Sequence, residues 1–320
     1  MSSPRRSAGT PLPDTPVPMQ YWEGVTGVRI AGDSWGPPEG PLVVLLHGGG
    51  QTRHAWKGTG ERLAAQGYHT VALDARGHGD SEWASDGDYL QSTMVDDLIA
   101  VLQQIDPAAR PVLVGASMGG GVALKAIGED HIDATALVLV DIAPRIEPEG
   151  VEKIRSFMFA KPEGFANLDE VADAIASYQP HRERPTNLAG LAKNLRLGED
   201  GKYHWHWDPV FMQGPRDLGA RQAQQEANAR NLTVPALLVR GGLSDIVSEE
   251  GAREFLALCP HAEYIDVVGA SHMVAGDRND VFADAVIEFL SRTVPVDGDP
   301  VVPPHHPHPH RDPTEILDVP

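Results

Sequence analysis

Short hydrophobic runs recur along the chain, and each is about as long as a β-strand. They occupy residues 41–46, 70–73, 111–114, 136–140, 235–239 and 264–268. Most are almost continuously apolar, as strands buried on both faces of a sheet must be. Longer stretches with helical spacing separate them, for example residues 93–104 and 121–129. The pattern predicts a mostly parallel α/β sheet flanked by helices.

One long interval interrupts this alternation. Between residues 142 and 231 no comparable strand run occurs, whereas residues 151–159, 168–178 and 188–197 have charges spaced between apolar positions as in helices. We therefore expect a helical insertion, a cap, over residues 145–211. The sheet-bearing core would then comprise residues 19–144 and 212–292.

The two ends of the chain differ from the rest in composition. Residues 1–18 contain five prolines, and residues 293–320 combine prolines with four histidines between positions 305 and 310. Neither segment has enough apolar residues to form a core, so both are expected to be disordered. The histidine-rich segment is assigned no metal site, because metal binding there would be adventitious.

Composition narrows the classes of partner. Hydrophobic residues make up 41% and charged residues 22% of the 320 residues, which is ordinary for a soluble domain. The formal charge of −19 argues against nucleic acids and anionic membranes as partners. Cys259 is the single cysteine, so no intrachain disulfide can form, and no apolar run of about 18 residues occurs. A cytoplasmic protein is expected, and a homo-oligomer is compatible with the sequence.

The strongest local motif is Gly115-Ala116-Ser117-Met118-Gly119. It follows the predicted strand 111–114 and precedes a predicted helix. A serine in such a strand–turn–helix is a nucleophile elbow, in which a strained turn lifts the hydroxyl out of the sheet. The Gly-x-Gly-x-x-Gly order of dinucleotide-binding loops is absent. Ser117 is therefore the candidate nucleophile.

A serine nucleophile needs a base and an acid that orients the base. His272 follows the predicted strand 264–268, and Asp245 follows the strand 235–239, so both lie at strand ends, where ligands bind in α/β sheets. The chain order Ser, Asp, His is the one expected for such a fold. Asp141 also ends a strand and competes for the acid's role. We predict His272 as base and Asp245 as acid, with Asp141 lining the pocket or bonding a loop.

Two further loops follow predicted strands. Residues 47–51, His-Gly-Gly-Gly-Gln, offer bare backbone, and the amides of Gly49 and Met118 are predicted to form an oxyanion hole, with His47 bracing the loop. Residues 74–81 also look charged enough for a site. Their glycines and turn-forming side chains instead favour a rigid loop bonded to its own backbone.

Candidate substrate-binding residues are aromatic or sulfur-containing. Trp205 and Trp207 belong to an aromatic cluster in the expected cap, and Trp56 and Met273 lie near the catalytic candidates in sequence. They predict a mostly apolar pocket for a small, uncharged acyl compound. His204 and His206 lack a third ligand, so no metal site is predicted.

With these motifs in order, residues 20–292 resemble the capped α/β-hydrolases, a group that includes esterases, non-haem haloperoxidase-like perhydrolases, lactonases and carbon–carbon bond hydrolases. The resemblance implies an eight-stranded sheet and hydrolysis of a carboxylic ester or lactone through an acyl-serine, without a cofactor. Perhydrolysis or carbon–carbon cleavage with the same triad remains an alternative, and a ligand-binding pseudoenzyme is a further one. Epoxide hydrolases and haloalkane dehalogenases carry aspartate at the elbow, so Ser117 argues against their activities.

Overall fold

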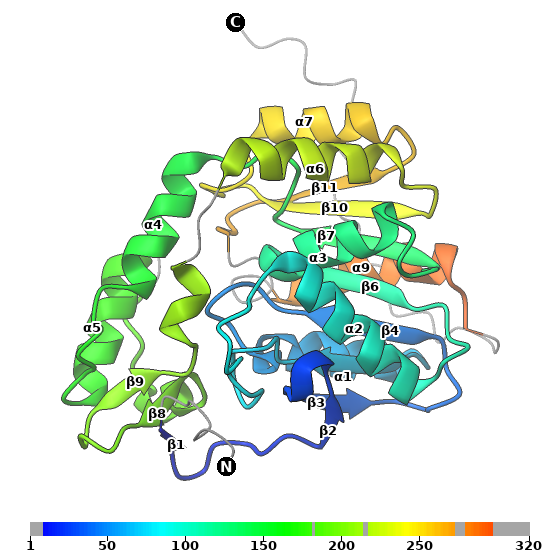
Figure 1. Cartoon of the computed structure of the whole chain (residues 1–320). Coiled ribbons are helices and arrows are strands. Elements are labelled where there is room, and N and C mark those ends of the chain that lie inside the picture. The colour runs from blue at the N-terminus through cyan, green and yellow to red at the C-terminus, as the bar shows by residue number, and fades with distance from the viewer. Residues whose placement is uncertain (1–8, 181–182, 214–216, 273–278, 297–320) are drawn as a thin grey trace, which may run out of the picture.

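The computed structural model describes residues 9–180, 183–213, 217–272 and 279–296. At its centre lies an eight-stranded sheet (Figure 1). Its strand order is β11-β10-β7-β6-β4-β5-β3-β2. Along this order the strands from β11 to β5 pair in parallel, and β3 is antiparallel to both β2 and β5. The predicted mostly parallel sheet is therefore confirmed. The strand bounds are β2 (Gln20–Glu23), β3 (Arg29–Trp35), β4 (Leu42–Leu46), β5 (His69–Leu73), β6 (Val112–Ala116), β7 (Ala136–Val140), β10 (Ala236–Gly241) and β11 (Glu263–Val267).

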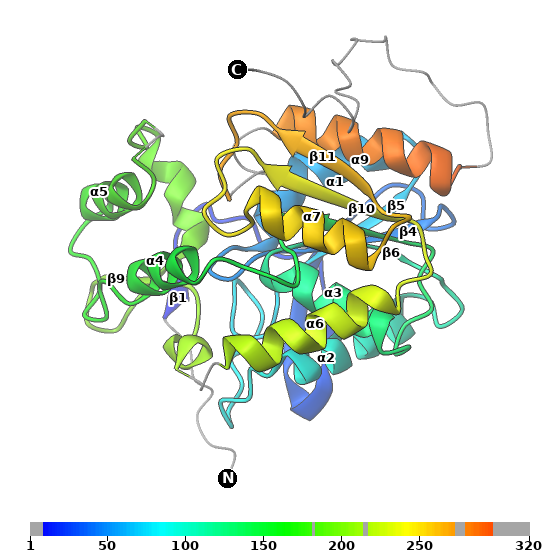
Figure 2. The same ribbon diagram turned by 90° about the horizontal axis from the view of Figure 1, so that it is seen from above.

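Helices pack on both faces of this sheet, as Figure 2 shows. One face contacts α2 (Gln91–Ile105), α3 (Met118–Gly128), α6 (Leu218–Arg230) and α7 (Glu249–Leu258). The other face contacts α1 (Lys57–Ala65) and α9 (Asn279–Thr293). Alternate residues of a strand serve opposite faces, so Val44 packs with the first group and Val43 with the second.

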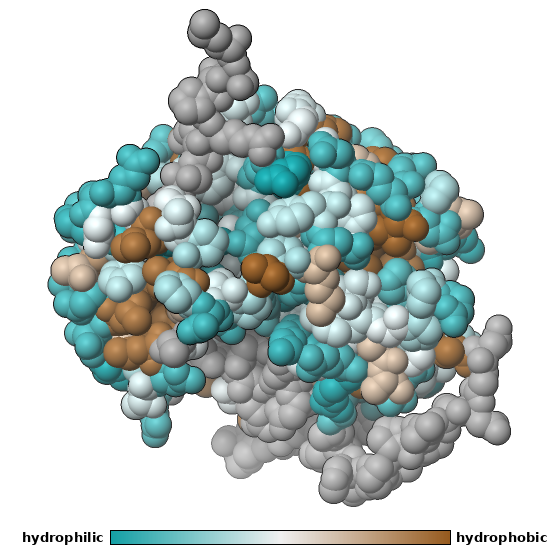
Figure 3. Space-filling model, turned by 90° about the horizontal axis from the view of Figure 1, so that it is seen from below, coloured by the Kyte–Doolittle hydropathy of each residue, from teal (hydrophilic) through white to brown (hydrophobic). Residues whose placement is uncertain are grey.

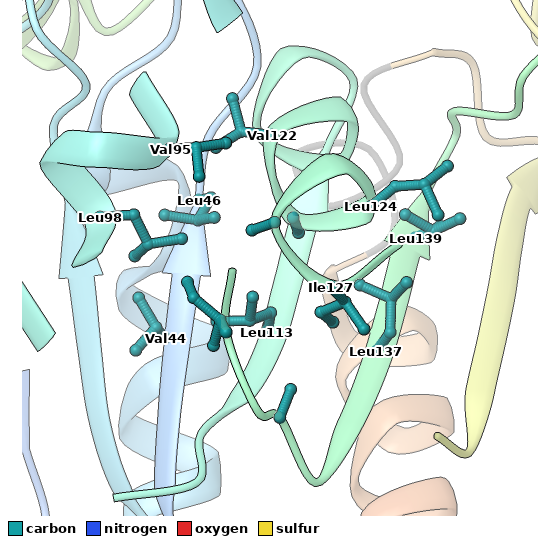
Figure 4. Packing of buried hydrophobic residues seen from close by; sticks show 14 of the residues in the cluster. Val44, Leu46, Val95, Leu98, Leu113, Val122, Leu124, Ile127, Leu137 and Leu139 are labelled. Atoms are coloured by element: carbon teal, nitrogen blue, oxygen red, sulfur yellow. The ribbon is translucent and has the colours of Figure 1, made fainter. Parts of the chain in front are cut away.

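The central strands are apolar throughout because both of their faces are covered. In Figure 4, Val44, Leu113 and Leu137 of three neighbouring strands lie beneath the side chains of α2 and α3. All three are fully buried. Each such side chain contributes about 1.5–3 kcal/mol through its removal from water.

Residues 145–211, the expected cap, leave the sheet after β7 and lie to one side of it in Figure 1. This segment contains α4 (Pro148–Met158), α5 (Leu168–Tyr178), the 3₁₀ helices η3 (Leu188–Asn194) and η4 (Pro209–Met212, which passes its boundary by one residue), β8 (Leu195–Leu197) and β9 (Tyr203–Trp205). The expectation of helix over 188–197 is wrong at its end. Leu195 is buried and pairs with Trp205, so the last three residues form a strand.

The N-terminal segment takes part in the cap. Strand β1 (Thr10–Pro11) pairs antiparallel with β8, and Leu12 is buried in the hydrophobic core of the cap. The expectation of disorder is therefore wrong for residues 9–18, because cap strand β8 supplies backbone partners; residues 1–8 lie outside the described residues. At the other end, the expectation of disorder is wrong for residues 293–296, because Tyr68 donates to the carbonyl of Val294 at 2.9 Å and Val296 packs against the core. Residues 297–320 lie outside the described part.

The surface is mainly polar on the face shown in Figure 3, where hydrophobic residues form only small groups. Among the described residues, no helix combines the length and apolar character needed to cross a membrane. Cys259 is buried, as expected of a core cysteine.

Candidate active site

Ser117 occupies a sharp turn between β6 and α3. Its backbone lies at φ 46° and ψ −108°, a conformation that side chains rarely adopt. A Cβ on Gly115 would lie 2.5 Å from the carbonyl carbon of Gly119, and one on Gly119 would lie 2.5 Å from the carbonyl oxygen of Leu46. The flanking glycines are therefore required by close packing, and the predicted elbow is present.

His272, after β11, is oriented by Asp141, which follows β7. The Nδ1 atom of His272 lies 2.6 Å from Oδ2 of Asp141, whose side chain is fully buried. Asp141 has φ 49°, and its Oδ1 accepts a hydrogen bond from the amide of Gly241 at 2.9 Å. This second bond fixes the carboxylate, which in turn holds the imidazole with its Nε2 edge available.

Asp245, the acid predicted from the sequence, does not contact His272. Its Oδ2 lies 2.7 Å from Nζ of Lys153 on α4, and both side chains are well exposed. The chain turns sharply after β10, with the amide of Ser244 bonded to the carbonyl of Gly241, and Asp245 points away toward the cap. The assignment of Asp245 to orient His272 is wrong, and the competitor Asp141 stands in that position.

The predicted oxyanion loop lies against the serine, since a Cβ on Gly48 would be 3.3 Å from Cβ of Ser117. The amide of Gln51 donates to the carbonyl of Gly48 at 3.0 Å, and Gly50, at φ 75°, completes this turn. Within the described residues, the amides of Gly49 and Met118 donate to no protein acceptor. They are thus available to a ligand.

His47 braces this loop, as predicted. The amide of Ala75 donates to its Nε2 at 3.0 Å, so the ring proton sits on Nδ1 and is donated to the carbonyl of Gly48 at 2.7 Å. Complete burial lowers the pKa of His47 to about 4. The ring is therefore neutral and serves as a fixed support.

A cavity of about 1080 Å³ lies between the strand ends and the cap. Ser117, His272, Gly49 and Met118 all line it, so the elbow, the base and the two free amides face one space. Its apolar wall comes mainly from the cap, including Ile154, Phe157, Met158, Leu191, Trp205 and Trp207.

The four predicted substrate-binding residues have different positions. Trp205 and Trp207 line the cavity and stack with ring centroids 4.9 Å apart. Trp56 is only 1% exposed and packs against Phe282 in the core beyond the sheet, so its predicted role in substrate binding is wrong. Its ring, at the start of α1, contacts Phe282 of α9 and so packs the two helices together. Met273 lies outside the described residues.

The cavity also has a polar wall that sequence reasoning missed. It includes Asp88, Gln91, Asp217, Arg221 and Gln224. Asp217 caps α6 by accepting from the amide of Ala220 at 2.9 Å, which is a recognisable sequence signal for a helix start. Nothing in the sequence marks its position in the cavity that Ser117 lines.

The charged loop 74–81 is structural, as predicted. Asp74 accepts from the amide of Asp80 at 2.9 Å, and Ser81 donates its hydroxyl to the carbonyl of Asp74. Fully buried Arg53 forms ion pairs with Asp74 at 2.6 Å and Asp80 at 2.7 Å, and with Asp33 at 3.0 Å. The loop is thereby fixed to the core.

The histidines of the cap do not form a metal site. His204 lies 3.1 Å from a carboxylate oxygen of Asp200 at the surface, whereas His206 is buried among core loops. Across the described ranges, no group of three or more His, Cys, Asp or Glu side chains is arranged to hold a metal ion.

Comparisons with known proteins show which family the chain belongs to. The sequence model of the family described as serine aminopeptidase, S33, matches residues 37–279. Esterase Rv0045c of Mycobacterium tuberculosis is 30% identical over 82% of this chain and 86% of its own length. The 3-hydroxybutyrate-oligomer hydrolase of Cupriavidus necator is 27% identical over 76% of this chain and 87% of its own length. The solved structure of E-2-(acetamidomethylene)succinate hydrolase superposes with a TM-score of 0.74 at 21% identity, covering 85% of this chain and 98% of that one. The chain therefore belongs to this family of serine hydrolases with the α/β-hydrolase fold.

Proposed function

We propose that the chain hydrolyses carboxylic esters or lactones through an acyl-serine intermediate. The observation that carries the proposal is the 2.6 Å contact between His272 and Asp141, beside a cavity that Ser117 also lines. The names of two relatives, an esterase and a hydroxybutyrate-oligomer hydrolase, support ester bonds as the target.

The proposed route begins with proton transfer. Asp141 accepts a hydrogen bond from the Nδ1–H of His272, so the lone pair of Nε2 can take the hydroxyl proton of Ser117 as its oxygen attacks the carbonyl carbon. The negative oxygen that forms accepts hydrogen bonds from the amides of Gly49 and Met118. Removing one such donor in a hydrolase typically costs about 3–4 kcal/mol of transition-state stabilisation.

Three proton movements complete the cycle. The tetrahedral intermediate collapses, and His272 returns its proton to the departing alcohol. Water then loses a proton to His272 and attacks the acyl-serine. As this second tetrahedral intermediate collapses, His272 gives the proton to the departing oxygen of Ser117, which releases the carboxylic acid and restores the hydroxyl. Apart from the substrate and water, every group in this route is a side chain or an amide of the chain itself.

The acyl part of the substrate is proposed to lie against the apolar cap wall. Phe157, Met158, Trp205 and Trp207 provide a large hydrophobic surface there. A cavity of about 1080 Å³ has room for more than a short acyl group. We therefore expect an uncharged, hydrophobic acyl group to be preferred over acetyl.

The experiment combines labelling with turnover. A fluorophosphonate probe should label the native chain once and hydrolysis of p-nitrophenyl butyrate should be measurable; both should vanish in Ser117→Ala. Ser156→Ala, at an exposed position on α4, is the matched control and should behave as the native chain. Labelling that persists in Ser117→Ala would overturn the nucleophile. Turnover of aminoacyl p-nitroanilides without turnover of esters would move the activity to amide bonds.

A further inference from the structure

The cap residue His206 contacts two loops of the core at once. Its side chain is buried, and the amide of Gly79 donates to its Nδ1 at 2.7 Å. Because Nδ1 accepts this bond, the neutral ring must carry its proton on Nε2. That nitrogen lies 3.3 Å from the carbonyl oxygen of Gly50. His206 therefore donates to the oxyanion loop.

The neutral tautomer of His206 is well defined. Burial lowers the pKa of His206 well below 6.5, and the nearby His78 and Arg196 lower it further. Protonation would also place an N–H at Nδ1 opposite the N–H of Gly79. The donor at Nε2 and the acceptor at Nδ1 are thus constant features of the folded chain near neutral pH.

Gly50 belongs to the turn that presents the amide of Gly49. The first residue of this turn, Gly48, is fixed from the core by His47 and by Gln51, whose Oε1 accepts from the amide of Gly48 at 2.8 Å. His206 reaches the far side of the turn from the cap. The peptide between Gly50 and Gln51 carries the carbonyl that accepts from His206 and the amide that donates to the carbonyl of Gly48 at 3.0 Å. Because the Gly48 carbonyl shares its peptide plane with the N–H of Gly49, the direction of the Gly49 N–H depends on both sides of the turn.

The segment around His206 is itself anchored to the core. The indole N–H of Trp83 donates to the carbonyl of His206 at 3.3 Å, and the amide of Asp208 donates to the carbonyl of Gly77 at 2.9 Å. The cavity-lining ring of Trp207 lies edge-on to His206, with centroids 5.3 Å apart. His206 is thus a rigid link between the loop 74–81, the cap wall and the oxyanion loop.

From these contacts we propose that His206 is a positioning residue for the oxyanion hole, by which the cap fixes the direction of the Gly49 amide. The proposal rests on the proposed ester hydrolysis and goes beyond it, because it gives the cap a part in transition-state stabilisation as well as in substrate binding.

Two replacements separate the two hydrogen bonds of the ring. In His206→Asn the amide oxygen can take the place of Nδ1 and keep the bond from Gly79, while the bond to Gly50 is lost. In His206→Gln the amide nitrogen can take the place of Nε2 and donate to Gly50, while the bond from Gly79 is lost. Each variant loses one hydrogen bond, so their melting temperatures should be similar.

The measurements are kcat and KM for p-nitrophenyl butyrate, and inhibition by an alkyl trifluoromethyl ketone. Addition of the serine oxygen to this ketone gives a tetrahedral oxyanion that occupies the hole, as the transition state does. In His206→Asn, kcat should fall roughly tenfold to hundredfold and the ketone should bind more weakly by a similar factor, with KM nearly unchanged. His206→Gln should recover most of both. Trp83→Phe, which removes a bond between the cap segment and the core, is the control for anchoring alone.

The outcomes distinguish this inference from the proposed function. Equal kcat and ketone affinity in the Asn and Gln variants, at equal melting temperature, would overturn the role of His206 while Ser117→Ala still abolishes turnover. A rise in KM alone in His206→Asn would also overturn it, because the residue would then act on substrate binding only. Turnover that survives in Ser117→Ala would instead remove the proposed function itself.

Discussion

Nδ1 of His272 meets Oδ2 of Asp141 at 2.6 Å across the ends of β11 and β7. Asp141→Asn would leave the size of the side chain unchanged but would favour the wrong imidazole tautomer. We predict a fall in kcat of about 10⁴-fold, as for the equivalent change in serine proteases. Asp245→Asn is the matched control and should retain kcat, since Asp245 is exposed and pairs with exposed Lys153. A large loss in the Asp245 variant together with an active Asp141 variant would reverse the assignment.

Replacement of Trp207 tests whether the apolar wall of the cavity contacts the acyl group of the substrate. Trp207→Ala should lower kcat/KM for p-nitrophenyl octanoate about tenfold relative to the acetate, because the longer acyl group loses contact with the stacked Trp205–Trp207 pair. Trp56→Phe, in the core beyond the sheet, should leave this ratio unchanged even where it lowers stability. An unchanged ratio in Trp207→Ala would limit Trp207 to packing.

Arg53 holds three carboxylates in place, so its loss should be severe. Arg53→Met would leave buried Asp74 without its charged partner and should lower the free energy of unfolding by about 3–5 kcal/mol. Arg292→Met breaks an exposed pair with Glu263 and should cost less than about 1 kcal/mol. Urea unfolding measures both, and equal losses would contradict the buried network.

We predict that three buried histidines make the folded chain less stable in acid. Burial lowers the pKa of His47 to about 4 and of His78 to about 3, and that of His206 well below 6.5. Between pH 6.5 and about 4, the unfolded chain therefore binds protons that the folded chain excludes. The free energy of unfolding must decrease as pH falls through this window, by up to about 1.4 kcal/mol per pH unit for each ring.

Urea unfolding at several pH values between 7.5 and 5 checks this expectation. His78→Asn removes one of the three rings. It should reduce the slope of the free energy of unfolding against pH by up to about 1.4 kcal/mol per pH unit, which corresponds to one bound proton. Replacement of exposed His131 by Gln serves as the control and should leave the slope in place. An identical slope in the native chain and His78→Asn would contradict the prediction.

The sequence identifies the parts of the fold that depend on local composition. Strands such as β4 and β7 are visible because both faces are buried, and Ser117 is visible because close packing demands glycines beside it. Strand β3 was missed because it contains Gly32 and Asp33, which break the apolar run, and β8 was missed because three residues cannot show a period.

The carboxylate that contacts His272 could not be chosen from the sequence. Asp141 and Asp245 both follow strands that end at the same edge of the sheet. Which carboxylate reaches His272 depends on backbone direction: Asp141 at φ 49° turns inward, whereas the turn at Gly241–Ser244 carries Asp245 to the surface. The link from His206 to Gly50 is likewise a contact between segments 156 positions apart, which no local pattern records.

The pairing of β1 with β8 joins residues that lie 187 positions apart, at Thr10 and Leu197. During synthesis the first strand must therefore wait until more than half of the chain has been made before its partner exists. Gene recombination that exchanged only residues 145–211 would also separate β1 from its partner strand β8. The cap is therefore built from two separate segments of the chain, and any transplanted or redesigned cap must carry both.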